Sequence, residues 1–390
     1  MSTSLSAHGD GRVVSIDALR GLAVLGILLM NVVSFGLPDP AYFNITNDGG
    51  DGLLDRAVGL LGEVLIDQKM MGLFSALFGA SIVLFIDRVG ARRRHPIVLS
   101  CWRNLLLLVI GLVHASFWEG DVLITYALCS PILLLARKLR GRTLVALGAF
   151  CMTLTAASGP LAQMILNSSG GAGQLGWYWF DQDLDAAPVV VTFFVTDSFL
   201  RALGMMLIGI AMYRSGVLDG SRSHEWYRRA AIAGLGTGIP LTVAGVVWIG
   251  ASGHSWRHAL ASNAPTTLAT APMVIGLVST VMLLLHRRPK SLDRLVPVGR
   301  MALTNYLSQT AIALFVLQEV FTRGEFDRAE LLLFTFAVWA LQIIWSQWWL
   351  THFTQGPTEW LWRVTTYLRW TPILPFVHPL RQRHAGAPRR

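Results

Sequence analysis

The chain has 390 residues and a formal net charge of +9, yet only 14% of its residues are charged and 53% are hydrophobic. A soluble protein would carry about a quarter charged residues, so the composition excludes a soluble globular enzyme and indicates a polytopic membrane protein. Because the basic residues lie in short clusters between apolar runs, as membrane topology signals do, we expect the lipid bilayer and no nucleic acid as a partner.

Apolar runs close to the length of a membrane-crossing helix recur along the whole chain. We predict an all-α transmembrane helical bundle of about ten spans, which form a single integral membrane domain. The spans are expected at roughly residues 16–36, 58–86, 98–118, 121–137, 142–161, 193–213, 230–250, 267–286, 298–320 and 329–352. The second is polar in its first half, so part of it is expected to lie in the membrane interface. The N-terminal helices occupy 16–160, and a C-terminal region occupies 193–390.

The segments between these spans alternate in charge. Lys and Arg cluster after the second, fourth, sixth, eighth and tenth spans, at residues 88–94, 137–142, 214–229, 287–294 and 363–390. The segments after the first, third and fifth spans are acidic or poor in Lys and Arg, at residues 39–55, 119–121 and 162–192. Because cytoplasmic loops carry an excess of Lys and Arg, the pattern predicts that the N-terminus and the C-terminus are both cytoplasmic.

The first predicted span carries polar residues in an apolar sequence. Asp17 and Arg20 are three residues apart and share a helix face near the cytoplasmic end, where an interfacial ion pair would satisfy them. Asn31 lies eleven positions beyond Arg20, about three turns further on roughly the same face. Taken singly, Asn31 is explained by a hydrogen bond to a neighbouring helix. Together the three residues predict a polar stripe that lines a cavity between helices.

Charged residues also occur at the second and sixth spans. Asp67 and Lys69 lie near the start of the second span, and we interpret them as interfacial. Asp197 and Arg201 are spaced i, i+4 in the sixth span, and we interpret them as a structural ion pair.

His114 lies near the end of the third span, with Glu119 and Asp121 just beyond it. A single histidine on an apolar helix more often makes a helix contact, but a nearby carboxylate can orient an imidazole and raise its basicity. The sequence has no HxxxH or HExxH spacing, and its three cysteines have no paired spacing. We therefore predict no metal site and no disulfide framework.

The ninth span opens with the sequence GRMALTNYLSQT. Asn305 and Gln309 are four residues apart and share a helix face. Arg300 precedes them at the predicted cytoplasmic end, where it could bind an anionic headgroup or a phosphate.

Six motifs, in this order, resemble the bacterial YeiB family, whose C-terminal half is a domain of unknown function. The motifs are IDALRGLAVLGILLMNVVSFGLP, MGLFSALFGA, GLVHASFWEGDVLITYAL, GMMLIGIAMYRSG, GRMALTNYLSQT and QGPTEWLWR. They extend over nearly the whole chain. The resemblance implies a multi-pass protein of the bacterial plasma (inner) membrane.

The YeiB family is itself remotely similar to the transmembrane acyltransferases, such as heparan-α-glucosaminide N-acetyltransferase and the bacterial enzymes that O-acylate surface sugars. In the O-acylating branch, an arginine of the first helix is followed, after ten intervening residues, by a histidine. Arg20 matches the arginine, but Asn31 stands where the histidine is expected. The glucosaminide branch has a functional asparagine there and a histidine in the adjoining loop, where this chain has Tyr42 and Asn44.

This resemblance implies an acyl-CoA donor at the cytoplasmic side and a sugar-like or envelope acceptor across the membrane. Arg20 and Arg300 would then hold the donor's phosphates, and Asn31 would donate a hydrogen bond to the thioester carbonyl as negative charge develops on it. His114, oriented by one of its two neighbouring carboxylates, would take the proton of the acceptor hydroxyl.

Asp17, Asn305 and Gln309 complete the side chains that we predict to line the binding site. A transporter or permease for a small solute or lipid is an alternative, since polar residues around a cavity fit both functions. A purely structural membrane partner is a third. Binding of acyl-CoA would separate the enzyme from the other two.

Overall fold

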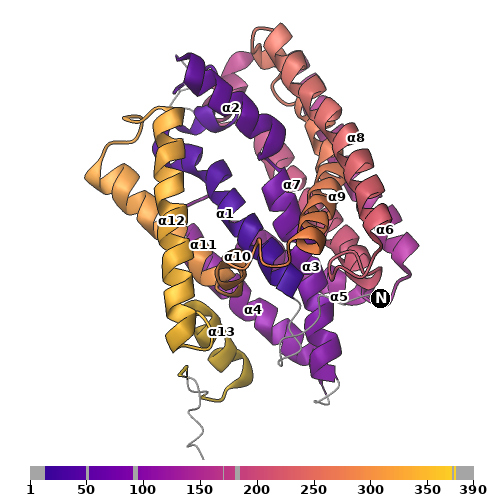
Figure 1. Cartoon of the computed structure of the whole chain (residues 1–390). Coiled ribbons are helices and arrows are strands. Elements are labelled where there is room, and N and C mark those ends of the chain that lie inside the picture. Colours follow the sequence, from indigo (N-terminus) through magenta and orange to yellow (C-terminus); the bar gives the residue numbers. More distant parts are fainter. Residues whose placement is uncertain are drawn as a thin grey trace, which may run out of the picture.

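The computed structural model of the chain describes residues 14–49, 52–90, 95–169, 171–180, 185–370 and 373–374. Within these ranges the regular secondary structure is helical throughout (Figure 1). Some residues of the charge pattern lie outside them: Asp51, Arg92, Arg93, Arg94, Asp181, Asp183, Arg381, Arg383, Arg389 and Arg390.

The α-helices are α1 (Val14–Gly36), α2 (Leu53–Leu65), α3 (Lys69–Gly90), α4 (Pro96–Ala115), α5 (Leu123–Ala136), α6 (Gly141–Ser169), α7 (Pro188–Arg214), α8 (His224–Ala251), α9 (Asn263–Arg287), α10 (Leu295–Arg300), α11 (Ala302–Leu314), α12 (Arg328–His352) and α13 (Pro357–Tyr367). Short 3₁₀ turns are η1 (Asp39–Tyr42), η2 (Ala172–Tyr178) and η3 (Trp256–His258), and η4 (Phe315–Val320) is π-helical. In Figure 1, α2 lies at one end of the bundle and α13 at the other.

Among the described residues, eight helical segments are long and apolar enough to cross a membrane. They are Val14–Gly36, Leu53–Gly90, Pro96–Ala115, Gly141–Ser169, Pro188–Arg214, His224–Ala251, Asn263–Arg287 and Arg328–His352. The two other predicted spans take a different form. The fourth is the shorter apolar helix α5. The ninth is divided by a non-helical Met301 into α10 and α11, and α11 continues directly into η4. Hydropathy averaged over a window does not detect such a break.

The second predicted span is two helices rather than one. The chain turns between α2 and α3 at Gln68, whose φ of 60° is left-handed. α2 presents exposed leucines, including Leu53, Leu54 and Leu61, as a helix lying in an interface would.

Glycines allow several helix pairs to pack with their backbones in contact. A methyl group at Gly299 of α10 would overlap the carbonyl of Asp17 in α1, and one at Gly21 would overlap the carbonyl of Leu295. The same applies to Gly209 of α7 against α3, and to Gly234 of α8 against α9. Small residues permit this approach in membrane helices, where van der Waals packing takes over from hydrophobic association. The α1–α10 contact brings Arg20 and Arg300, each next to one of these glycines, to the same place.

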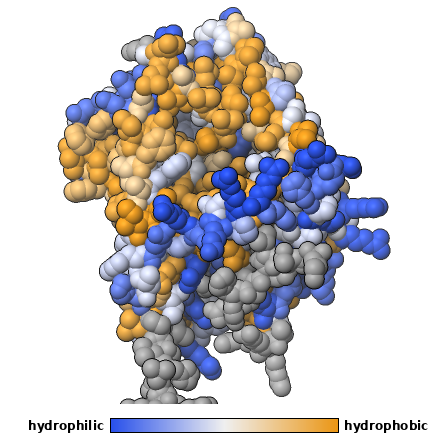
Figure 2. All heavy atoms as spheres, in the orientation of Figure 1, coloured by the Kyte–Doolittle hydropathy of each residue, from blue (hydrophilic) through white to orange (hydrophobic). Residues whose placement is uncertain are grey.

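The outer surface of the bundle is rich in apolar side chains. Leu135, Val195, Leu333 and Ile344 are each more than 60% exposed, an arrangement that suits contact with lipid and not with water. Figure 2 shows hydrophobic side chains covering the upper part of one face, with hydrophilic side chains gathered below. Helix length, composition and surface together identify a multi-pass membrane protein.

Candidate functional site

A small cavity of about 190 Å³ lies between α1, α3, α4, α10, α11 and α13. Arg20 of the predicted stripe lines it. The guanidinium of Arg20 forms an ion pair with Asp17 (Nη1 to Oδ1, 3.0 Å) and donates from Nη2 to Ser81 Oγ at 2.6 Å. Asp17 is buried and lines neither this cavity nor the larger one described below. Its carboxylate holds Arg20 in place.

Two further arginines line the small cavity. Arg300 donates from Nη2 to the backbone carbonyl of Thr354 at 3.0 Å. Arg103, which the sequence analysis did not select, lies with its guanidinium carbon 4.0 Å above the ring of Trp362 and 4.6 Å from that of Phe85. Its signal in the sequence was a lone arginine inside an apolar run.

Glu359 is the carboxylate that lines this cavity, so three arginines face one acid. Its Oε1 accepts hydrogen bonds from the backbone N–H groups of Leu303 (2.7 Å) and Thr304 (3.1 Å). A side chain of α13 therefore caps the start of α11 and closes one wall of the cavity. The net positive lining suits an anionic group such as a phosphate.

His114 is buried and its two ring nitrogens are both hydrogen-bonded. Nδ1 lies 2.7 Å from Asp121 Oδ1, and Nε2 lies 2.9 Å from the hydroxyl of Thr310. The hydroxyl of Tyr306 donates to the same Asp121 oxygen over 3.4 Å. Of the two predicted carboxylate partners, Asp121 is the one that contacts the imidazole; Glu119 is exposed. We name His114, Asp121, Tyr306 and Thr310 the histidine cluster.

A large cavity of about 1,660 Å³ lies on the other side of this cluster. Tyr306 lines the small cavity and Asp121 lines the large one, while His114 lines neither. The histidine cluster therefore forms part of the wall between the two spaces.

The predicted stripe on α1 is shared between the two cavities. Asn31 lines the large cavity, together with Glu119, whereas Arg20 lines the small one. Eleven residues of helix separate Arg20 from Asn31, a rise of about 16 Å. A single small ligand therefore cannot contact both residues.

Asn305 and Gln309 line neither cavity. The amide of Asn305 donates to the carbonyl of Val298 at 3.1 Å and to Ser346 Oγ at 3.0 Å, and its oxygen accepts from Trp345 Nε1 at 3.1 Å. Gln309 donates to the carbonyl of Val24 at 3.2 Å. These hydrogen bonds hold α11 against α10, α12 and α1.

The large cavity is lined by Asp67, Asp197 and Arg201, which the sequence predicted to be interfacial or structural, but not by Lys69. Arg201 Nη2 contacts both oxygens of Asp197, at 2.5 and 2.6 Å, and Thr267 Oγ1 at 3.1 Å. Asp67 accepts from the hydroxyl of Tyr42 over 3.4 Å. Tyr42 is half-buried, and desolvation together with the nearby Asp67 carboxylate raises the pKa of its hydroxyl well above the ordinary value, so the hydroxyl keeps the proton that it donates.

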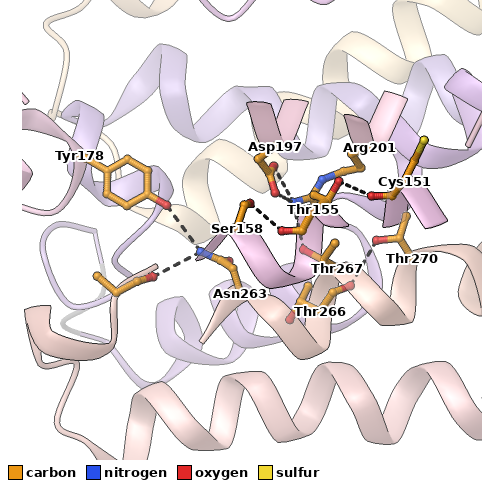
Figure 3. A network of polar contacts seen from close by, with 11 residues as sticks. Cys151, Thr155, Ser158, Tyr178, Asp197, Arg201, Asn263, Thr266, Thr267 and Thr270 are labelled. Carbon is orange, nitrogen blue, oxygen red and sulfur yellow. Dashed lines mark hydrogen bonds and ion pairs between the residues drawn. The ribbon is translucent and has the colours of Figure 1, made fainter. Parts of the chain in front are cut away.

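Two stacked aromatic rings lie beside these charged residues. Phe43 stacks on Tyr178 with ring centroids 4.2 Å apart, and Asn263 Nδ2 lies 3.5 Å from the Tyr178 hydroxyl. Figure 3 shows Tyr178 and Asn263 pointing toward one another near the Asp197–Arg201 pair. The signal that could have found this group was a buried ion pair in a membrane span, which marks a functional site more often than a structural one.

Comparison with known proteins identifies the family to which the chain belongs. Residues 212–369 match the family described as "Protein of unknown function (DUF418)". The chain is 33% identical over 378 residues to "Uncharacterized protein YeiB" of Escherichia coli K12, covering 91% of this chain and 96% of that protein. This chain belongs to the YeiB family.

Two relatives from Bacillus extend the comparison. "Uncharacterized protein YxaH" of Bacillus subtilis is 29% identical over 411 residues, with 96% of this chain and 98% of YxaH covered. "Uncharacterized 39.9 kDa protein in amylase 3'region" of Bacillus acidopullulyticus is 27% identical over 374 residues, with 94% and 96% covered.

In this YeiB-family chain, the region that matches DUF418 supplies only part of each cavity. Arg300 and Glu359 of the small cavity lie within it, whereas Arg20 and Arg103 lie outside it. The site is therefore built by both halves of the chain.

Proposed function

We propose that this chain is a transmembrane acyltransferase. An acyl-CoA donor binds at the small cavity, and a sugar-like or envelope acceptor binds in the large cavity. The observation that carries the proposal is the wall between the two cavities, which contains His114 bonded to Asp121 at 2.7 Å. A donor site and an acceptor site on opposite sides of the histidine cluster suit group transfer through a membrane. The remote similarity of the family to transmembrane acyltransferases supports the same activity.

The orientation completes the proposal. We propose ten crossings with both termini in the cytoplasm, in which α5 and the α10–α11–η4 segment cross as the fourth and ninth. The small cavity then faces the cytoplasm, where acyl-CoA is made, and the large cavity faces outward. The positive charge of the loops on the α13 side supports this orientation.

The arginines of the small cavity are the proposed donor site. The cavity volume of about 190 Å³ suits a narrow chain such as the thioester arm and not a whole nucleotide. The phosphates would therefore lie at its mouth, beside Arg20, Arg103 and Arg300, which supply charge-assisted hydrogen bonds.

The transfer step exchanges one bond for another. The acceptor oxygen attacks the thioester carbon, the C–O bond forms, the C–S bond breaks, and the acceptor's proton passes by way of His114 to the leaving thiolate. His114 Nε2 must release Thr310 to receive that proton, while Asp121 holds Nδ1 and stabilises the imidazolium. Asn31 keeps its predicted role as donor to the thioester carbonyl, which requires the acyl end to reach the large cavity.

A transporter is the second candidate, because the large cavity contains the buried Asp197–Arg201 pair. A transporter would not require a binding site for acyl-CoA. This candidate predicts uptake of a solute and no binding of acyl-CoA.

The deciding experiment is acetyl-CoA binding to the detergent-purified chain. We expect saturable binding that Arg20→Ala and Arg300→Ala each weaken about tenfold, the loss of one charge-assisted hydrogen bond. Arg228→Ala is the matched control, since Arg228 is exposed and pairs with Glu225 far from the cavity. His114→Ala should retain binding and lose transfer. A folded protein that fails to bind the donor at about millimolar concentration would favour transport.

A further inference from the structure

Arg201 is an incompletely satisfied cation at the large cavity. Only 2% of the residue is exposed, and it lines that cavity. Its Nη2 is engaged by Asp197 and Thr267, but Nε and Nη1 are buried without a hydrogen-bond partner in the described part of the chain. Leaving buried N–H groups unpaired costs about 1–3 kcal/mol each, and more on a cation. A ligand that brings oxygen acceptors would remove that cost.

The charges around the cavity limit what that ligand can be. Seven acidic side chains line it against three arginines. The acids are Asp39, Glu63, Asp67, Glu119, Asp121, Asp185 and Asp197, and the arginines are Arg201, Arg323 and Arg328. The excess of acids disfavours an anion, and the unsatisfied N–H groups of Arg201 disfavour a simple cation. A hydroxyl group satisfies both, because it accepts from Arg201 and donates to a carboxylate.

The cavity also reaches the apolar surface of the bundle. Leu61 of α2, Leu128 of α5 and Val195 of α7 line it, and each is more than half exposed. Leu128 and Val195 lie about 8–10 Å inside the starts of their helices. The opening is therefore rimmed by side chains that face hydrocarbon, at a depth that an acyl chain can occupy.

We propose that the large cavity binds a membrane lipid with an uncharged, polyhydroxylated headgroup. The headgroup lies against Arg201 and Asp67 with the Phe43 and Tyr178 rings beside it, and the hydrocarbon chains leave past Leu128 and Val195. This inference deepens the proposed function, since it makes the acceptor lipid-borne. Binding does not require the transfer step, so the two proposals can fail separately.

The test is native mass spectrometry of the full chain in detergent, with three probes added in turn. The first is glucosyl diacylglycerol, the second phosphatidylglycerol, and the third methyl glucoside, which has a sugar headgroup without chains. We expect one bound glucosyl diacylglycerol per chain and at least tenfold weaker binding of the other two.

Two variants locate the site. Asp197→Asn with Arg201→Gln removes both charges together, so no unpaired charge is left buried, and should weaken glucosyl lipid binding about tenfold. Val195→Trp narrows the rim on the lipid-facing surface and should weaken the lipid without changing the weak binding of methyl glucoside. Arg228→Gln is the control and should change neither.

Three results would overturn the inference. Equal affinity for methyl glucoside and the lipid would make the ligand a free solute. Tighter binding of phosphatidylglycerol than of glucosyl diacylglycerol would show that the ligand of the large cavity is an anionic lipid. Lipid retention unchanged in both variants would place the lipid on the outer surface only. Acetyl-CoA binding, measured on the same samples, reports on the proposed function independently.

Discussion

Polar residues within this bundle differ in whether their hydrogen bonds are complete. Asn305 is fully buried, and its amide is satisfied by Val298, Ser346 and Trp345. Arg201 is equally buried and leaves two nitrogens unpaired. Both residues are polar groups in an apolar helix, so sequence alone treats them alike. Whether all buried polar atoms have hydrogen-bond partners distinguishes a residue that holds helices together from one that we propose to bind a ligand.

Asn305→Ala should destabilise the protein by about 2 kcal/mol or more, because the buried Ser346 hydroxyl and the Trp345 N–H would both lose the amide group that pairs with them. The melting temperature in detergent measures this change. Thr153→Ala, which removes an exposed hydroxyl bonded only within α6, should have little effect. If folded Asn305→Ala lost acetyl-CoA binding at unchanged stability, the predicted binding role would stand and the structural one would fail.

At the scale of helices, close packing through glycine decides which side chains share a cavity. Gly21 and Gly299 let α1 and α10 touch backbone to backbone. That contact sets Arg20 and Arg300, about 280 residues apart along the chain, at one small cavity. A larger residue at either position would separate the two arginines.

Gly299→Ala should therefore destabilise the chain by about 1–3 kcal/mol and weaken acetyl-CoA binding, because the new methyl group overlaps the Asp17 carbonyl. Gly236→Ala is the matched control. Gly236 also lies within a helix, but a methyl group there meets open space, so alanine should be neutral or stabilising by up to about 1 kcal/mol. Equal melting temperatures for the two variants would contradict the packing argument.

For the whole molecule, the number of crossings determines which side each cavity faces. Eight segments qualify as spans by length and composition, and α5 and the α10–α11–η4 segment are shorter or broken. If α5 did not cross the membrane, every loop between α5 and the α10–α11–η4 segment would lie on the opposite side of the membrane. The orientation of the proposed donor site depends on these two segments.

Cysteine labelling in intact cells tests the ten-crossing arrangement, on a background in which Cys101, Cys129 and Cys151 are replaced by serine. We expect Ser221→Cys and Lys290→Cys to resist a membrane-impermeant reagent, and Ala251→Cys and Thr322→Cys to react. All four positions are exposed, so burial cannot explain a difference. Labelling of Ser221→Cys would contradict the ten-crossing arrangement with cytoplasmic termini.

The sequence determined much of this structure because the bilayer imposes simple rules. Long apolar runs must be helices, since unpaired backbone groups are too costly in hydrocarbon. The all-α membrane class and the family were predicted on that basis and from motifs, and both are confirmed. The proximity of His114 to a carboxylate was also accessible, because Asp121 lies only seven residues along the chain.

Tertiary structure alone decided the remainder, because contacts between distant helices leave no periodic signal in a single sequence. The break at Met301 and the turn at Gln68 divided two predicted spans. Packing placed Arg103 beside Arg20, and it separated Asn31 from Arg20 into a different cavity. Whether Arg201 is satisfied depends on which atoms of α7 and α9 surround it, and only the folded chain defines those neighbours.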